Sequence, residues 1–302
     1  TSDLAAKNGM RVMHGISLPK DEAKYLDEEW KAQTLASCRE LATAFKDDPN
    51  IFCWGIGNEV QLSGANGSAV WSFIEELAVA IKEIAPRHLV STVVSHDKSA
   101  LDSIARYAPS LDVIGINSYG PILEVKDMVA SSDWKGPYMI TEWGPTGWWE
   151  TDKTTWDASI EQTSEQKRQV YEERYNKAIL GDERCLGSFV FLWGQKEDRT
   201  PTWFSMFVEG KVEGLPLKGE KTPMVEAMQR VWSGEEPAET APVVTAISIN
   251  GKCPVESPTV AAGESFKVEV MATDREQEEL TYIWEVLHEA TVLGFGGSYE
   301  PR

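Results

Sequence analysis

The fold expected for this chain is decided by one stretch, Pro49-Asn50-Ile51-Phe52-Cys53-Trp54-Gly55-Ile56-Gly57-Asn58-Glu59-Val60. A run this apolar is typical of a strand buried on both faces, yet it ends in an amide and a carboxylate. Alternation along the run puts small residues on the Glu59 face and large ones on the other. Small side chains inside and large ones against an outer helical layer favour a strand of a narrow barrel.

A second stretch, residues 138–144, has the same construction and delivers Glu142 to the end of another apolar strand. The carboxyl ends of parallel barrel strands meet at one face, where barrel enzymes build their active sites. Two carboxylates at such a face are what glycoside hydrolysis needs, one as an acid and one as a nucleophile or base. The alternative is a pair of structural, ion-paired glutamates.

Strand and helix patterns alternate through the first three quarters of the chain, which predicts α/β architecture with a parallel sheet. Besides the strand that ends at Glu59, strands are expected at 10–16, 89–95, 113–120, 138–144 and 188–195. Six βα units are too few for a closed eight-stranded barrel. We therefore expect a (β/α)8 TIM barrel that lacks strands 1 and 2, so that the chain is a fragment.

A change in composition predicts a domain boundary near residue 235. Residues 235–242 have a linker composition rich in Glu, Pro, Ala and Thr, after a partial catalytic domain at 1–234. Residues 243–302 alternate in the manner of β-strands, at 243–250, 265–273 and 280–286. This segment resembles the Ig-like sandwiches of the PKD and cadherin-like kind, and a partial β-sandwich is expected.

Composition excludes several kinds of partner. The net charge of −19 argues against nucleic acid and against an anionic membrane surface, whereas a neutral polysaccharide or oligosaccharide is compatible with it. No apolar run is long enough for membrane insertion. The four cysteines lack metal-ligand spacing, so neither a metal nor another cofactor is expected, and the oligomeric state stays open.

The motifs Gly57-Asn58-Glu59 and Thr141-Glu142-Trp143-Gly144 resemble those of the retaining glycoside hydrolases of clan A, which include families 2 and 5. The resemblance implies that Glu59 is the general acid/base and Glu142 the nucleophile. It further implies that Asn58 contacts the sugar 2-hydroxyl and that Tyr119 holds the nucleophile as an anion. Alternatively, Tyr119 is a tyrosine at the rim of the core.

Aromatic residues and histidines complete the expected site. Trp193 resembles the aromatic floor beneath the reacting sugar, with packing in the core as its alternative. Trp143 and Trp203 lie in or near loops on the active face and are candidate sugar platforms. His14 and His96 lie near strand ends and could touch substrate, although a histidine hydrogen-bonded for structural reasons is the simpler interpretation.

The resulting hypothesis is a secreted retaining β-glycoside hydrolase that acts on a neutral β-glycan of the glucan or mannan type. Two alternatives stay open: a transglycosylase of the same fold and a non-catalytic carbohydrate-binding scaffold. The sequence does not separate hydrolysis from transglycosylation, because loop shape decides which acceptor resolves the intermediate.

Overall fold

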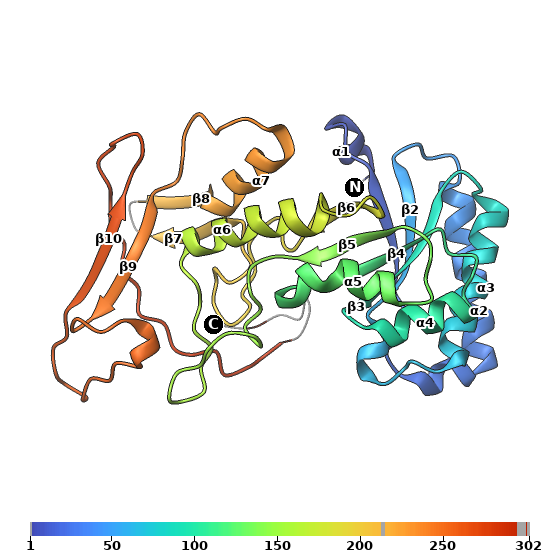
Figure 1. Cartoon of the computed structure of the whole chain (residues 1–302), viewed down its shortest axis with the longest axis horizontal. Helices are drawn as coiled ribbons and strands as arrows, with labels where there is room; N and C mark the ends of the chain where they lie inside the picture. The colour runs from blue at the N-terminus through green and yellow to red at the C-terminus, as the bar shows by residue number, and fades with distance from the viewer. Residues whose placement is uncertain (1, 213–214, 295–299, 301–302) are drawn as a thin grey trace. The chain divides into compact units, whose positions relative to one another are not determined.

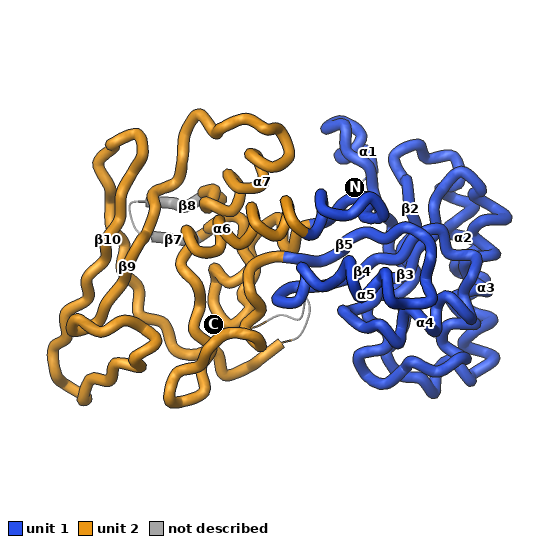
Figure 2. The backbone as a smooth tube through the Cα atoms, in the orientation of Figure 1, with its two compact units in different colours: residues 1–143, 178–189 blue, residues 144–177, 190–302 orange. Residues whose placement is uncertain are grey.

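The computed structural model describes residues 2–212, 215–294 and 300. By its internal contacts the chain divides into two compact units, residues 1–143 with 178–189 and residues 144–177 with 190–302 (Figure 2). This division is not the boundary near residue 235 expected from composition, which stays a prediction. Of the expected sandwich, residues 295–299 and 301–302 lie outside the described part.

Unit 1 is built on a six-stranded parallel sheet in the order β1-β2-β3-β4-β5-β6, which forms a half-barrel. Its strands are β1 (Val12–Ile16), β2 (Ile51–Asn58), β3 (Leu89–Ser95), β4 (Val113–Asn117), β5 (Tyr138–Trp143) and β6 (Cys185–Val190). Neighbours in sequence are neighbours in the sheet, as right-handed βα connections produce. The expected partial TIM barrel is confirmed.

Helix α1 (Ser2–Lys7) precedes the first strand, and a helix follows each of the first four strands. These are α2 (Glu28–Phe45), α3 (Ser68–Ile84), α4 (Lys98–Tyr107) and α5 (Val125–Ser131), of which α2, α3 and α4 lie together on one side of the sheet (Figure 1). Short 3-10 helices lie at Glu22–Leu26, Val60–Ser63 and Gly120–Glu124. Helix α3 is the most apolar of the cover, with Trp71, Ile74 and Leu77 fully buried.

The interior of the half-barrel has the expected distribution of side-chain sizes. Cys53 packs with Val113 and Met139 on the inner face. Trp54 points outward, where its indole Nε1 donates to His88 Nδ1 at 3.1 Å. A Cβ at Gly115 would lie 2.7 Å from the Thr141 methyl, so only glycine fits between these strands.

Unit 2 departs from the expected repeat. The strand expected at 188–195 ends at Val190, so Trp193 lies beyond it. A helix does not follow β6 directly, because an antiparallel hairpin of β7 (Phe207–Val212) and β8 (Leu215–Lys221) precedes α7 (Pro223–Ser233). Helix α6 (Ser164–Arg174), which continues as a π-helix at Tyr175–Ile179, packs against α7.

The C-terminal segment forms a two-stranded antiparallel sheet of β9 (Val243–Ile249) and β10 (Val268–Thr273). A short 3-10 helix at Pro254–Glu256 lies between the two strands in the sequence. The strand expected at 280–286 is wrong: those residues have no regular secondary structure. The side chains of Tyr282, Trp284 and Val286, which the alternating pattern predicts to be buried on one face, are 50%, 55% and 90% exposed. An Ig-like sandwich stays a prediction.

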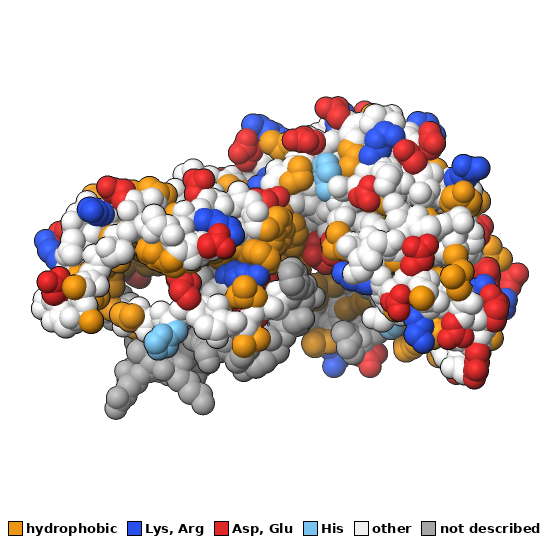
Figure 3. Space-filling view, turned by 90° about the horizontal axis from the view of Figure 1, so that it is seen from below, with side chains coloured by type: hydrophobic (Ala, Val, Ile, Leu, Met, Phe, Trp, Pro, Cys, Tyr) orange, Lys and Arg blue, Asp and Glu red, His pale blue; other side chains and the backbone are white. Residues whose placement is uncertain are grey.

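Charge is spread over the surface. On the face shown in Figure 3, acidic and basic side chains are interspersed and no large patch of one sign stands out. A search of the described residues finds no helix of the length and apolarity that a membrane crossing requires.

Candidate active site

Two carboxylates lie at the same edge of the half-barrel. Glu59 follows β2 directly, and Glu142 is the next-to-last residue of β5, where it pairs in register with Asn117 of β4. Both positions are carboxyl ends of parallel strands, as expected from the sequence. The negative charge of Glu59 contributes to raising the pKa of Glu142.

The end of β2 bends sharply. Gly57 has φ +73°, Glu59 has φ +51° and ψ +41°, and the pairing with β3 shifts register between Gly55 and Asn58. The Glu59 amide nevertheless donates to Val93 O at 2.9 Å. A glutamate in the left-handed region costs about 1 kcal/mol, and such strained residues cluster at functional sites.

The surroundings of Glu142 act on its pKa in both directions. Burial raises its pKa to about 7, and the negative charge of Glu59 acts in the same direction. Hydrogen bonds from Tyr119 and Asn58 oppose this by stabilising the anion, as does the charge of Lys20. The Tyr119 hydroxyl donates to Glu142 Oε2 at 3.3 Å. Glu142 therefore exchanges its proton near neutral pH.

A chain of hydrogen bonds fixes Asn58. The Thr141 hydroxyl donates to Asn117 Oδ1 at 2.8 Å, and Asn117 Nδ2 donates to Asn58 Oδ1 at 3.1 Å. With its oxygen engaged, the Asn58 amide turns its N–H groups toward Glu142, which accepts from it. Asn117 and Thr141 were not among the expected site residues, because nothing in a single sequence distinguishes them from ordinary strand-end residues.

Lys20 is a third site residue that no sequence pattern indicated. It ends the loop after β1, and its Nζ lies 3.7 Å from Glu59 Oε2. The Lys20 side chain is 44% exposed and that of Glu59 is 20% exposed, so the ion pair lies at the mouth of the site.

Of the two expected histidines, one lies near the carboxylates. His96 Nδ1 is 3.1 Å from Ser118 Oγ, and the Ser118 amide donates to the Glu142 carbonyl at 2.9 Å. His14 packs instead among aromatic rings, 5.0 Å from that of Trp54 and 5.6 Å from that of Phe45. That is the helix-facing side of the sheet, so the structure does not bring His14 to Glu59 and Glu142.

The three expected tryptophans differ in exposure. Trp143 follows Glu142 and is fully buried. Trp203 of unit 2 is also buried, with its indole N–H donating to Thr146 O at 3.1 Å. Trp193 of unit 2 is 50% exposed and contacts the rings of Phe207 and Trp232. Contact of any of these with a sugar stays a prediction.

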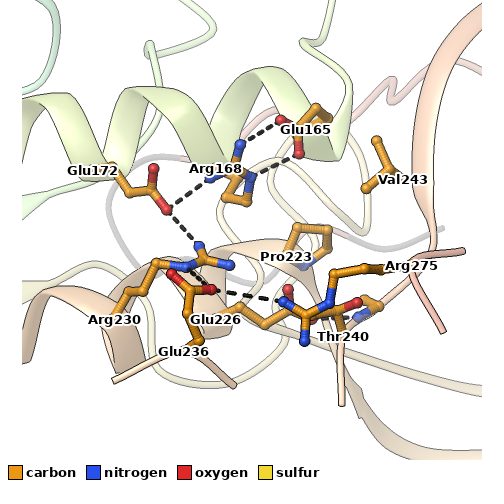
Figure 4. Close-up of a pocket in the computed structure, with 11 residues that line it drawn as sticks. Glu165, Arg168, Glu172, Pro223, Glu226, Arg230, Glu236, Thr240, Val243 and Arg275 are labelled. Carbon is orange, nitrogen blue, oxygen red and sulfur yellow. Dashed lines mark hydrogen bonds and ion pairs between the residues drawn. The ribbon is translucent and has the colours of Figure 1, made fainter. Parts of the chain in front are cut away.

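Each unit contains a cavity. One of about 420 Å³ in unit 2 is lined by ion-paired side chains, in which Arg230 links Glu172 to Glu236 and Arg168 links Glu165 to Glu172 (Figure 4). Another, of about 380 Å³, lies in unit 1 beside His88 and Phe52. Neither cavity is lined by Glu59 or Glu142.

Within the part of the chain that the structure describes, no three His, Cys, Asp or Glu side chains come together as a metal site would require. Cys38 and Cys53 are buried free thiols, while Cys185 is half-buried and Cys253 is exposed. Burial raises the pKa of the Cys53 thiol to about 12, which keeps it protonated and unreactive.

Known proteins of two kinds are similar to this chain, although no family model matches it. Mannan endo-1,4-β-mannosidase F of Aspergillus clavatus is 26% identical over 88 residues, which is 29% of this chain and 20% of that protein. The probable mannan endo-1,4-β-mannosidase A-2 of Aspergillus terreus is 29% identical over 72 residues, 24% of this chain and 18% of that one. The chain thus spans about a fifth of the length of these relatives.

Solved structures share the fold. A family 2 β-galacturonidase from Eisenbergiella tayi, bound to glycerol, superposes with a TM-score of 0.58 at 18% identity, covering 80% of this chain and 43% of that one. A Lactobacillus rhamnosus β-glucuronidase gives 0.54 at 13% identity, covering 76% and 41%. The chain carries a partial TIM-barrel-like domain whose fold is similar to that of these family 2 glycoside hydrolases.

The resemblance to clan A glycoside hydrolases expected from the two glutamate motifs is therefore confirmed as a resemblance of fold and of part of the sequence. In this half-barrel, Glu59 and Glu142 stand at the second and fifth described strands, and Asn58 and Tyr119 are both bonded to Glu142.

Proposed function

We propose that the protein is a retaining β-glycoside hydrolase in which Glu142 is the nucleophile and Glu59 the general acid/base. The observation that carries the proposal is the coupled pair of strand-end carboxylates, one of them bonded by both Tyr119 and Asn58. A buried carboxylate whose pKa is strongly shifted by burial and by a specific charged neighbour is typical of a functional site.

The geometry supports a division of labour between the carboxyls. Attack on the anomeric carbon requires an ionised Glu142, and the Tyr119 hydroxyl and the Asn58 amide both stabilise that anion. Glu59, which is more accessible, donates a proton to the departing glycosidic oxygen and later takes one from water. Glu142 leaves the anomeric carbon in that second step, and the configuration is retained.

The substrate proposed is a neutral β-glycan of the mannan or glucan type. The mannanase relatives favour mannan, and the net charge of −19 disfavours a polyanionic polymer. Because a polymeric glycan does not enter cells, the proposal includes an extracytoplasmic location. Water resolves the intermediate in this proposal, and a sugar acceptor would make the same site a transglycosylase.

The test is hydrolysis of β-mannan, β-glucan and aryl β-glycosides by the intact protein, with Glu142→Gln and Glu59→Gln as variants. We expect each variant to lose at least about 10³-fold in kcat on its natural substrate, because each removes one chemical step. Glu40→Gln, an exposed substitution on α2, is the matched control and should retain activity.

The stereochemistry of the first-formed sugar decides the mechanism. Proton NMR during the first turnovers should show the β-anomer, as two displacements require. An α-anomer would contradict the retaining mechanism. A folded protein that cleaves none of these substrates, with wild type and Glu142→Gln indistinguishable, would favour the carbohydrate-binding scaffold instead.

A further inference from the structure

Gln61 lies two residues beyond Glu59, and the mechanism above does not use it. It is the second residue of the 3-10 helix at Val60–Ser63, and its side chain is buried. Its amide Nε2 donates to the Ser95 hydroxyl, at the end of β3, at 2.9 Å. Among the described residues, no donor reaches its Oε1. The bond to Ser95 is therefore what the polar end of Gln61 contributes in the described part of the chain.

We propose that Gln61 is a positioning residue: its bond to Ser95 fixes the turn that carries Glu59 and thereby places the acid/base carboxyl relative to Glu142. Ser95 is the other member of the bond and has the same role. This inference rests on the proposed function, because the placement of Glu59 affects a reaction only if Glu59 supplies and takes up the proton.

The turn at Glu59 needs an anchor on each side. Glu59 has φ +51° and ψ +41°, and a non-glycine residue keeps such a conformation only where its surroundings hold it there. Before the turn, the Glu59 amide donates to Val93 O of β3 at 2.9 Å. After it, the Leu62 amide donates back to Glu59 O at 3.2 Å, which closes the turn but does not attach it to the sheet. The bond from Gln61 to Ser95 attaches this side of the turn to β3.

The strand end that receives Gln61 is itself fixed relative to Glu142. Ser95 is the last residue of β3 and pairs in register with Asn117 of β4. Asn117 in turn pairs with Glu142 of β5. Gln61 therefore connects the Glu59 turn, through one side-chain bond and two strand pairings, to the strand that carries the proposed nucleophile.

The reaction is sensitive to the placement of both carboxyls. A retaining mechanism needs them about 5 to 5.5 Å apart, and a displacement of about 1 Å can cost about 10²-fold in rate. A turn that is released on one side lets the Glu59 carboxyl move away from the glycosidic oxygen, whereas Glu142 keeps its place on β5. The loss should therefore fall on proton transfer and not on the attack by Glu142.

The experiment compares kcat/KM on phenyl and 2,4-dinitrophenyl β-glycosides of mannose and glucose for wild type, Gln61→Met and Ser95→Ala. A phenol leaves slowly unless it receives a proton, whereas 2,4-dinitrophenolate leaves without one. General acid catalysis contributes about 10²- to 10⁴-fold, and we expect each variant to lose about tenfold on the phenyl glycoside and less than about twofold on the dinitrophenyl glycoside. A residue that only stabilises the fold would lower both alike, and that result would contradict the proposal.

Further variants test the bond itself. The double variant Gln61→Met/Ser95→Ala should lose no more than the worse single variant, because both substitutions remove the same interaction. Ser95→Thr retains the hydroxyl and should recover most of the activity on the phenyl glycoside. Gln33→Met, which removes an exposed glutamine bonded to Glu29 on α2, is the matched control and should behave as wild type. Equal kcat/KM on the phenyl glycoside for wild type and the double variant, or equal losses in Ser95→Thr and Ser95→Ala, would overturn the proposal.

A second measurement is independent of turnover. Amide hydrogen exchange, followed by mass spectrometry, should be faster at residues 59–64 in the double variant and unchanged at residues 138–143. Unchanged exchange at residues 59–64 would refute the role of Gln61. If the protein cleaves no glycoside while exchange at residues 59–64 rises, the proposed function fails and the anchoring of the turn by Gln61 stands.

Discussion

At the scale of single residues, the carboxyl group of Glu142 is buried, which disfavours its charge, and it accepts hydrogen bonds that favour its charge. Its burial disfavours the charge that Tyr119 and Asn58 are arranged to stabilise. Sites that keep such a group sacrifice some stability for function. This conflict is measurable without any substrate.

The stability of the folded chain should depend on pH through Glu142. Its pKa rises from 4.5 to about 7 on folding, so the folded chain holds this proton over a range in which the unfolded chain has lost it. Stability is therefore unaffected well below pH 4.5 and falls as the pH rises toward 7, by up to about 3 kcal/mol.

Glu142→Gln removes this penalty. We expect its Tm to exceed that of wild type by several degrees at pH 8 and the difference to shrink toward zero by pH 4, as followed by circular dichroism. Glu40→Gln serves again as the control. A variant less stable than wild type at pH 8 would contradict the raised pKa.

The amide chain behind Asn58 gives another prediction at this scale. Thr141→Val retains the shape of the side chain but leaves Asn117 Oδ1 without the Thr141 hydroxyl. We expect roughly a tenfold loss of kcat with little change in KM, because Asn58 loses its fixed orientation. Thr141→Ser, which retains the hydroxyl, should lose much less; equal losses would show that the methyl group and not the hydrogen bond matters.

At the scale of elements, the strands were largely predictable, because apolar runs between helical patterns leave few alternatives. Their ends were not. Glu59 was expected on the strand, but it lies one residue past the end of β2 and has a left-handed backbone conformation. The hydrophobic pattern does not reveal the bend at Gly57 that ends the strand. The β7–β8 hairpin was missed because its charged residues hide the alternation expected of strands.

Lys20, Asn117 and Thr141 could not be found from sequence for a related reason. Asn117 and Thr141 reach the site through the pairing of strands that are distant in sequence, as when Asn117 pairs with Glu142, and Lys20 reaches it through the loop after β1. Glu59, Glu142, Asn58 and Tyr119 were predictable because their motifs end apolar runs. The predicted residues and the missed ones come together only through contacts between strands and loops that are distant in sequence, and a local sequence pattern does not report such contacts.

The bend at the end of β2 can be tested with two glycines. Gly57 and Gly64 both have positive φ, but a Cβ at Gly57 would lie 3.0 Å from the Val60 side chain, whereas a Cβ at Gly64 would meet nothing within 4 Å. We expect Gly57→Ala and Gly64→Ala each to cost about 1 kcal/mol of unfolding free energy for backbone strain.

Only Gly57→Ala should also displace Glu59. We expect its kcat to fall by 10-fold or more, while that of Gly64→Ala stays within about twofold, when both are assayed well below their unfolding temperatures. Equal activities would show that the bend does not position Glu59.

At the scale of the whole molecule, the segment expected to be a linker is fastened within unit 2. Glu236 pairs with Arg230 at 2.8 Å, the Lys221 ammonium donates to Glu239 O, and the Thr240 hydroxyl donates to Glu276. Arg275 donates to Pro237 O at 2.9 Å. Composition predicted a linker here, because composition depends on the residues of the segment and not on the partners that they bind.

These contacts are mostly exposed, so each contributes little alone. We expect Arg275→Ala to raise the rate of limited proteolysis within residues 235–242 by about two- to fivefold at low salt, with a smaller difference at 1 M NaCl. Arg106→Ala on α4, far from this segment in sequence, is the control. Cleavage that is unaffected by Arg275→Ala would show that the segment is free already.

The proposed mechanism requires Glu142 to form a covalent bond to a sugar. The most direct test incubates the intact protein with 2-deoxy-2-fluoro glycosyl fluorides of mannose, glucose and galactose, followed by peptide mapping by mass spectrometry. We expect one sugar on the peptide that contains Glu142, none on the peptide that contains Glu59, and no label in Glu142→Gln. Labelling of another carboxylate, or of none in a folded protein that cleaves no β-glycoside, would contradict the account.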